Sequence, residues 1–152
     1  MAAATFQHRY FVNVSTPKVY EYLSQPQNYV GLSPLVTEVS DPESSQDNQG
    51  QRVIHYEAIE TFTFLGFMRY PNRIKVDVIL THPDKQMINL VEAALNVRLK
   101  FIFDFQPEGS GTWIHESVTA QMPLPLRGFV VAQAKAVQLA RGEILKERLE
   151  NS

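Results

Sequence analysis

Apolar residues recur along the chain with a period of two in some segments and a helical period in others. Residues 6–14 alternate between apolar and polar positions, which predicts a half-buried strand. Ser15 or Thr16 can cap a helix and Pro17 suits a first helical position, so a short helix is expected over residues 18–23. A second short helical segment is expected near Pro26. The chain thus begins with one strand and two short helices.

Six more strands are predicted after this opening, over residues 36–40, 52–64, 73–81, 86–93, 96–106 and 112–122. The polar stretch 41–51 is expected to be a turn, and the short connections favour an antiparallel meander. Two strands show clearly which face should be buried. On the strand over residues 52–64 neither face is purely apolar, and the face with the bulkier Tyr56 and Phe62 is favoured over the face of Val53, His55, Glu57 and Ile59. The expected inward residues are Ile54, Tyr56, Ala58, Glu60 and Phe62, then Val97, Leu99, Phe101, Phe103 and Phe105, then Ile114, Glu116, Val118, Ala120 and Met122.

A long helix is predicted after Pro123 and Pro125, and no other element is long enough to cover the apolar face of the sheet. Its apolar stripe contains Leu126, Val130, Val137 and Ile144. Small residues such as Ala134 either bring the helix close to the sheet or leave space beneath it. A cavity and a core filled by the phenylalanines opposite are both consistent with this pattern.

The resulting fold class is α+β, in one domain over residues 1–152. The segment "FVNVSTPKVYEYLSQPQNYVGLSPLV" resembles the opening of the SRPBCC superfamily, the helix-grip proteins that include START, Bet v 1-like and polyketide cyclase proteins. The segment "GFVVAQAKAVQLARGEILKERLE" is similar to their closing helix. The resemblance implies a seven-stranded curved antiparallel sheet around that helix, with a cavity between them. Members bind lipids, sterols, plant hormones, quinones or polyketides, and some are cyclases.

Composition narrows the classes of function. A formal net charge of -2 argues against nucleic acid as a partner, and the lack of cysteine excludes disulfides, thiolate metal sites and a cysteine nucleophile. No signal peptide or membrane span is visible, so a cytoplasmic location is expected. The four histidines show no ligand spacing, and no phosphate-binding loop appears, so neither a metal nor a cofactor is expected. The oligomeric state stays open.

Two inward polar residues are the leading candidates for chemistry. Gln133 lies within the helical stripe, where its amide either binds a ligand or bonds to a strand residue or water. Glu116 is the best candidate for acid–base work, together with Tyr10, Tyr56 or His8; otherwise it is solvated or paired with Arg127 or Lys135. The full set of candidate ligand-binding residues is His8, Tyr10, Tyr56, Phe101, Phe103, Glu116, Val118, Val130, Gln133, Ala134 and Val137.

An apolar turn interrupts the strands at residues 62–68, where a polar turn would be ordinary. Phe64, Leu65, Phe67 and Met68 could form an edge over residues 62–69 that contacts a membrane or a protein transiently. Arg69 and Arg73 nearby would suit lipid phosphates. A hairpin that closes the cavity as a lid is the alternative.

Three functions follow. The favoured one is binding or carrying a hydrophobic small molecule, such as a lipid, quinone or polyketide-like compound, between the sheet and the final helix. The second is a cyclase or dehydratase that uses acid–base groups in the same cavity. The third is an interaction module that uses the apolar turn.

Overall fold

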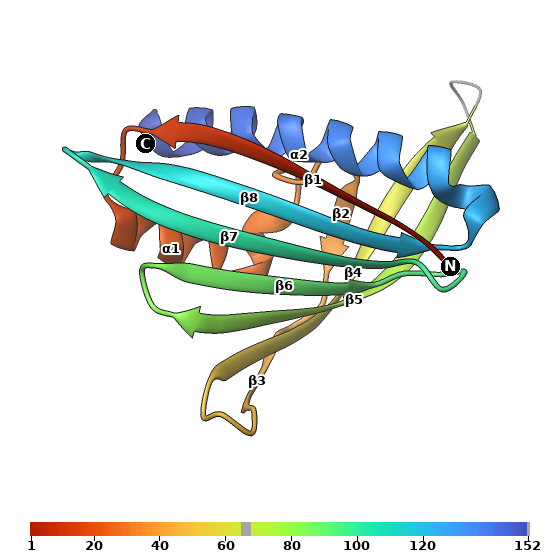
Figure 1. Ribbon diagram of the computed structural model, residues 1–152, viewed down its shortest axis with the longest axis horizontal. Coiled ribbons are helices and arrows are strands. Elements are labelled where there is room, and N and C mark those ends of the chain that lie inside the picture. Colours follow the sequence, from red (N-terminus) through yellow and green to blue (C-terminus); the bar gives the residue numbers. More distant parts are fainter. Residues whose placement is uncertain (65–67, 152) are drawn as a thin grey trace.

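The computed structural model describes residues 1–64 and 68–151 and shows a curved antiparallel sheet wrapped around a long helix (Figure 1). The strands are β1 (Ala2–Val12), β2 (Val36–Val39), β3 (Glu43–Gln46), β4 (Arg52–Phe64), β5 (Met68–His82), β6 (Gln86–Glu92), β7 (Arg98–Glu108) and β8 (Gly111–Met122). The helices are α1 (Thr16–Leu23), α2 (Arg127–Glu150) and the short 3-10 helices η1 (Pro26–Tyr29) and η2 (Leu124–Leu126). The strand order is β1-β8-β7-β6-β5-β4-β2, with β3 also paired to β4.

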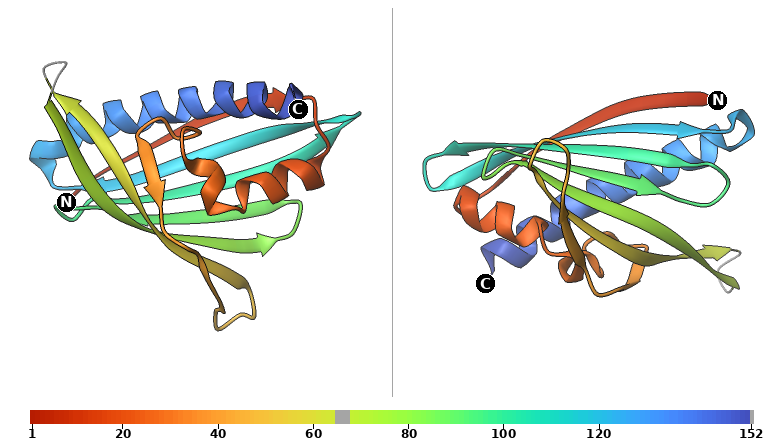
Figure 2. Two further views of the ribbon diagram at one scale, coloured as in Figure 1. Left: turned by 180° about the vertical axis from the view of Figure 1, so that it is seen from behind. Right: turned by 90° about the horizontal axis from the view of Figure 1, so that it is seen from below.

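All helices of the described chain cover one face of the sheet, and α1 lies near the C-terminal end of α2 (Figure 2). The predicted α+β helix-grip architecture, with short helices after the first strand, is confirmed. Within the described residues, no helix combines the length and apolarity needed to span a bilayer.

Two strand predictions need correction. The sheet has eight described strands, because β3 forms inside the segment expected to be a turn. All four residues of β3 are exposed. The sequence of this edge strand therefore shows no alternation of apolar and polar residues that could have predicted it. Strand β5 begins at Met68 and not at residue 73, and it includes Pro71. Strand β6 pairs with β5 only from Lys75 onward, so Pro71 occupies an edge segment where its missing N–H is tolerated.

The predicted inward faces are confirmed on three strands. On β8, Ile114, Glu116, Val118, Ala120 and Met122 are fully buried. On β4, Ile54, Tyr56 and Ala58 are buried and Glu60 is half-buried, whereas the side chain of Phe62 lies outside the described part of the structure. On β7, Phe103 and Phe105 are buried, as is Val97 just before the strand, whereas Leu99 and Phe101 are only half-buried. This last difference marks the place where the interior is not filled.

The main core lies at one end of the sheet, beneath α1 and the second half of α2. There Val19 and Leu23 of α1, Tyr29 of η1 and Leu145 of α2 pack in one cluster with Phe103 on the sheet. A smaller cluster beneath the start of α2 contains Val97, Ala120 and Met122. The two clusters leave space between the first half of α2 and strands β4, β5 and β7.

Candidate functional site: a cavity beneath the first half of α2

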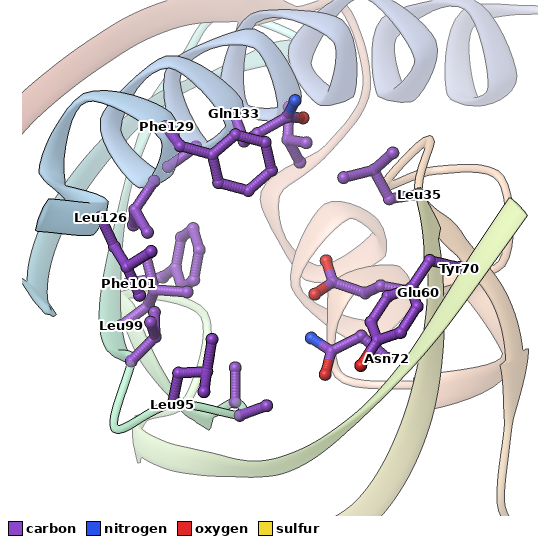
Figure 3. Close-up of a pocket in the computed structure, with 16 residues that line it drawn as sticks. Leu35, Glu60, Tyr70, Asn72, Leu95, Leu99, Phe101, Leu126, Phe129 and Gln133 are labelled. Carbon is purple, nitrogen blue, oxygen red and sulfur yellow. The ribbon is translucent and has the colours of Figure 1, made fainter. Parts of the chain in front are cut away.

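A cavity of about 340 Å³ lies between the sheet and the first half of α2 (Figure 3). This volume falls within the range of small-molecule sites in proteins. Its lining residues are Leu35, Glu60, Tyr70, Asn72, Ala93, Ala94, Leu95, Val97, Leu99, Phe101, Leu126, Phe129, Val130, Gln133, Ala134 and Val137. Twelve of these sixteen side chains are aliphatic or phenyl groups, so the cavity suits an apolar ligand.

The helix wall of the cavity is built by the apolar stripe of α2. Val130, Ala134 and Val137 follow one another at helical spacing on this wall. The short side chain of Ala134 keeps the space open where a larger residue would fill it. Gln133 also lines the cavity, and its amide forms no hydrogen bond within the described residues. The alternative expectation was a hydrogen bond from this amide to a strand residue. Because no such bond forms in the described part of the chain, the Gln133 amide is available to a ligand.

The opposite wall carries polar groups from β4 and β5. Glu60 and Asn72 are directly paired across the two strands, and Tyr70 lies two residues before Asn72 on the same face. Figure 3 shows these three side chains together, facing Phe101 and Leu99 across the space. Burial raises the pKa of the Glu60 carboxyl, and the charge of Arg141 offsets only part of that rise.

A second, smaller pocket of about 60 Å³ continues inward from the cavity. The two share Glu60, Leu99, Phe101 and Val137 as lining residues. The polar side chains that line the inner pocket are Tyr29, Ser33, Tyr56, Glu60, Asn89 and Arg141. Asn89 Nδ2 donates to the Tyr29 hydroxyl at 3.2 Å, and burial raises the pKa of Tyr29 to about 12. The interior therefore changes from apolar to polar with depth.

Arg141, which lines the inner pocket, forms a buried ion pair with Glu116. Glu116 is fully buried and Arg141 is 4 % exposed. Arg141 Nη2 donates to Glu116 Oε1, Arg141 Nη1 donates to Ser33 Oγ at 3.1 Å, and Gln138 Nε2 donates to the Glu116 carbonyl at 3.0 Å. Burial alone would lower the pKa of Arg141, but the Glu116 carboxylate more than offsets this and the pKa is raised.

The predicted ligand-binding residues divide into two groups. Phe101, Val130, Gln133, Ala134 and Val137 line the cavity, and Tyr56 lines the inner pocket. His8, Tyr10, Phe103, Glu116 and Val118 line neither one, contrary to expectation.

The second group is excluded because α2 packs tightly on β1 and β8 in its second half. Gly142 permits this approach: a Cβ atom there would lie 3.2 Å from the Tyr10 ring and 3.3 Å from His8 Nε2. Burial and the nearby Glu116 carboxylate raise the pKa of Tyr10. Neither of the two pockets reaches these residues.

The expectation for Glu116 is corrected in one further respect. Its partner is Arg141, and neither Arg127 nor Lys135 pairs with it. Arg141 lines the inner pocket but Glu116 lines neither pocket, so the ion pair joins the helix to the sheet and presents no carboxylate to a ligand. Arg141 follows Val137 by four residues, so the helical period already placed a charged residue on the apolar stripe. The position of Arg141 on this stripe was the signal in the sequence that a buried carboxylate such as Glu116 would pair with it.

Three polar lining residues were missed from the sequence. Glu60 was on the predicted inward face of its strand but was not recognised as a cavity group. Tyr70 and Asn72 flank Pro71, and the expected strand began only after them. Extending the alternation of β5 back across the proline would have placed both residues on the face of Ile74.

The predicted apolar turn falls mostly outside the described part of the chain. Leu65 and Phe67 lie outside the described residues, and the side chains of Phe64 and Met68 are not described. The expected membrane or partner edge therefore stays a prediction. For metals, the described residues contain no group of three or more His, Asp or Glu side chains placed to hold an ion.

Replacing Glu60 by Gln should raise the thermal stability of the protein at neutral pH. Because burial raises the pKa of Glu60, the folded chain holds this proton more tightly than the unfolded chain. Ionisation of Glu60 therefore lowers the free energy of unfolding of the wild type. This loss begins as the pH rises through about 4.3, the pKa in the unfolded chain, and it is complete above the raised pKa of the folded chain. We expect Tm to be roughly 2–4 °C higher in the variant at pH 7 and equal near pH 3.5.

Thermal unfolding of Glu60→Gln and Glu57→Gln across pH 3.5–8 measures this difference. Glu57 is the matched control, because it lies on the same strand but forms an exposed ion pair with Arg73 at 3.1 Å. A constant difference between Glu60→Gln and the wild type at every pH would contradict the assignment of a buried, proton-binding Glu60.

Comparison with known proteins identifies the fold. No family model matches the chain, and no curated protein shows significant similarity to it. Among solved structures, the Zhui aromatase/cyclase from Streptomyces sp. R1128 is 14% identical with a TM-score of 0.73, covering 98% of this chain and 94% of that one. A START superfamily protein from Mycobacterium smegmatis is 15% identical with a TM-score of 0.71, covering 97% of both chains.

A third structure is the di-domain ARO/CYC StfQ from the steffimycin biosynthetic pathway, 14% identical with a TM-score of 0.72. This chain is covered over 98% of its length and spans 52% of StfQ. Identities this low establish the architecture alone. The chain therefore has the same helix-grip fold as these three proteins.

Proposed function

We propose that the protein binds a hydrophobic small molecule in the cavity beneath the first half of α2. The observation that carries this proposal is the cavity itself, about 340 Å³ in volume with a mainly aliphatic and aromatic lining. A packed protein interior contains few voids much larger than a water molecule. A space of this size is therefore better explained by an occupant than by a packing defect.

The solved structures with the same fold give the proposal further support. They include an aromatase/cyclase and a START superfamily protein, and the fold suits hydrophobic ligand binding or cyclase chemistry. A carrier needs only the cavity and its lining. Ligand binding is therefore the simpler function for this chain.

A cyclase or dehydratase activity is the second candidate, and Glu60 is the observation in its favour. A carboxyl group with a raised pKa at the junction of the two pockets suits acid–base chemistry. Such chemistry usually needs a second converging group. Tyr70, the other titratable residue lining the large cavity of the described structure, is 58 % exposed. Binding without catalysis is thus the better supported function.

Titration with N-phenyl-1-naphthylamine, an uncharged apolar fluorescent probe, tests the binding function. We expect saturable fluorescence enhancement with one site per chain and a Kd on the order of 1–10 μM, as is reasonable for an unoptimised ligand of this size. Native mass spectrometry of the same mixture should show one bound probe. A lack of saturation together with only unliganded protein in the mass spectrum would contradict the proposed function.

A further inference from the structure

The two walls of the cavity have different chemistry, and this difference restricts the ligand. Leu99 and Phe101 of β7 and Val130 of α2 form an apolar surface on one side. On the other side, Glu60 and Asn72 form a cross-strand pair with adjacent side chains. Figure 3 shows the polar atoms of Glu60 and Asn72 directed at the space between the walls. A ligand that fills the cavity would meet both surfaces at once.

The polar side chains of this wall have unused hydrogen-bonding capacity. Neither the Glu60 carboxyl nor the Asn72 amide forms a hydrogen bond within the described residues, and the same is true of the Tyr56 hydroxyl. Half-buried polar groups without partners favour a ligand that supplies those partners. Along β4, Tyr56 and Glu60 are four residues apart on one face, so the polar groups form a line from the cavity into the inner pocket.

The charges around the cavity argue against an anionic ligand. Arg141 is the cationic residue among those that line the two pockets, and its charge is already paired with Glu116. Burial also raises the pKa of Glu60, which shows that this wall disfavours negative charge. A carboxylate or phosphate group would therefore enter the cavity without an available counter-charge.

We propose that the ligand is an uncharged amphipathic molecule that carries hydroxyl or carbonyl groups along one edge. That edge lies against Glu60 and Asn72, and the apolar edge lies against β7 and α2. This inference rests on the proposed function and adds to it the chemical class of the ligand and the residues that select it. Glu60 and Asn72 are specificity-determining residues in this account.

Three probes of similar shape test the selection: naphthalene, 2-naphthol and 2-naphthoate, measured by equilibrium dialysis at pH 7. We expect 2-naphthol to bind at least fivefold tighter than naphthalene, as one or two good hydrogen bonds would provide. We expect it to bind about tenfold tighter than 2-naphthoate, which carries a negative charge. In Glu60→Leu, the preference for 2-naphthol over naphthalene should fall to within twofold.

Controls keep this test independent of folding. Glu57→Leu removes a carboxylate from the outer face of the same strand and should keep the wild-type preference. Asn72→Leu is a second variant of the selecting wall and should also reduce the preference, should Glu60→Leu fail to fold.

The outcomes separate the two proposals. If naphthalene binds the wild type as tightly as 2-naphthol, or if 2-naphthoate binds tightest, the inference about ligand class is wrong while the binding function stands. If none of the three probes binds and N-phenyl-1-naphthylamine also fails to bind, both are wrong. A preference for 2-naphthol that Glu60→Leu and Asn72→Leu leave unchanged would overturn the assignment of these residues as selecting groups.

Discussion

The Arg141→Met variant is expected to lose about 3–5 kcal/mol of folding free energy, the usual result of breaking a buried ion pair by removing one partner. Glu116 is fully buried and receives a hydrogen bond from the Arg141 guanidinium. Without that guanidinium the carboxylate must either stay charged in an apolar surrounding or take up a proton. Urea denaturation at pH 7 measures the loss.

Two controls identify the cause. Arg73→Met removes an arginine from the exposed pair with Glu57 and should cost at most about 1 kcal/mol. The double variant Arg141→Met with Glu116→Leu removes both charges and should recover most of the stability lost by Arg141→Met. If the double variant is as unstable as the single one, the loss comes from packing of the arginine side chain and not from the unpaired carboxylate.

The Ala134→Trp variant is expected to weaken binding of N-phenyl-1-naphthylamine by at least about tenfold, equivalent to roughly 1.4 kcal/mol. Ala134 lies on the cavity wall of α2, so an indole ring at this position would occupy much of the 340 Å³ space. The variant should fold, because its added side chain fills a void and displaces no core residue. Fluorescence titration measures Kd, and circular dichroism confirms the fold.

Ala136→Trp is the matched control for this experiment. Ala136 lies two residues further along the same helix and is exposed, so the same substitution there adds an indole ring outside the cavity. We expect the affinity of this variant to stay within twofold of the wild type. Equal affinity of Ala134→Trp and the wild type would show that the probe binds elsewhere.

The fold could be predicted from the sequence because most of its elements carry a clear period. The alternation on β7 and β8 identified the buried faces, and the final apolar helix was the one predicted element long enough to cover most of them. Strand β3 could not be predicted in this way. Its residues are all exposed, and it forms only because the backbone of β4 offers an edge for pairing.

The candidate site was predictable in part. Gln133 and Ala134 were identified because they lie near the apolar stripe of a helix. The pattern could not show how closely each part of α2 approaches the sheet. That distance depends on Gly142, which lets the second half of α2 close over Tyr10 and His8 and so confines the open space to the first half. Long-range packing of this kind leaves no local signal.

The most direct measurement of the central claim is a crystal structure of the protein with N-phenyl-1-naphthylamine bound. We predict electron density for one probe between α2 and the sheet, in contact with Phe101 and Val137 and beneath Ala134. Density for the probe at another place, with the cavity filled by rearranged side chains of the protein, would contradict the account.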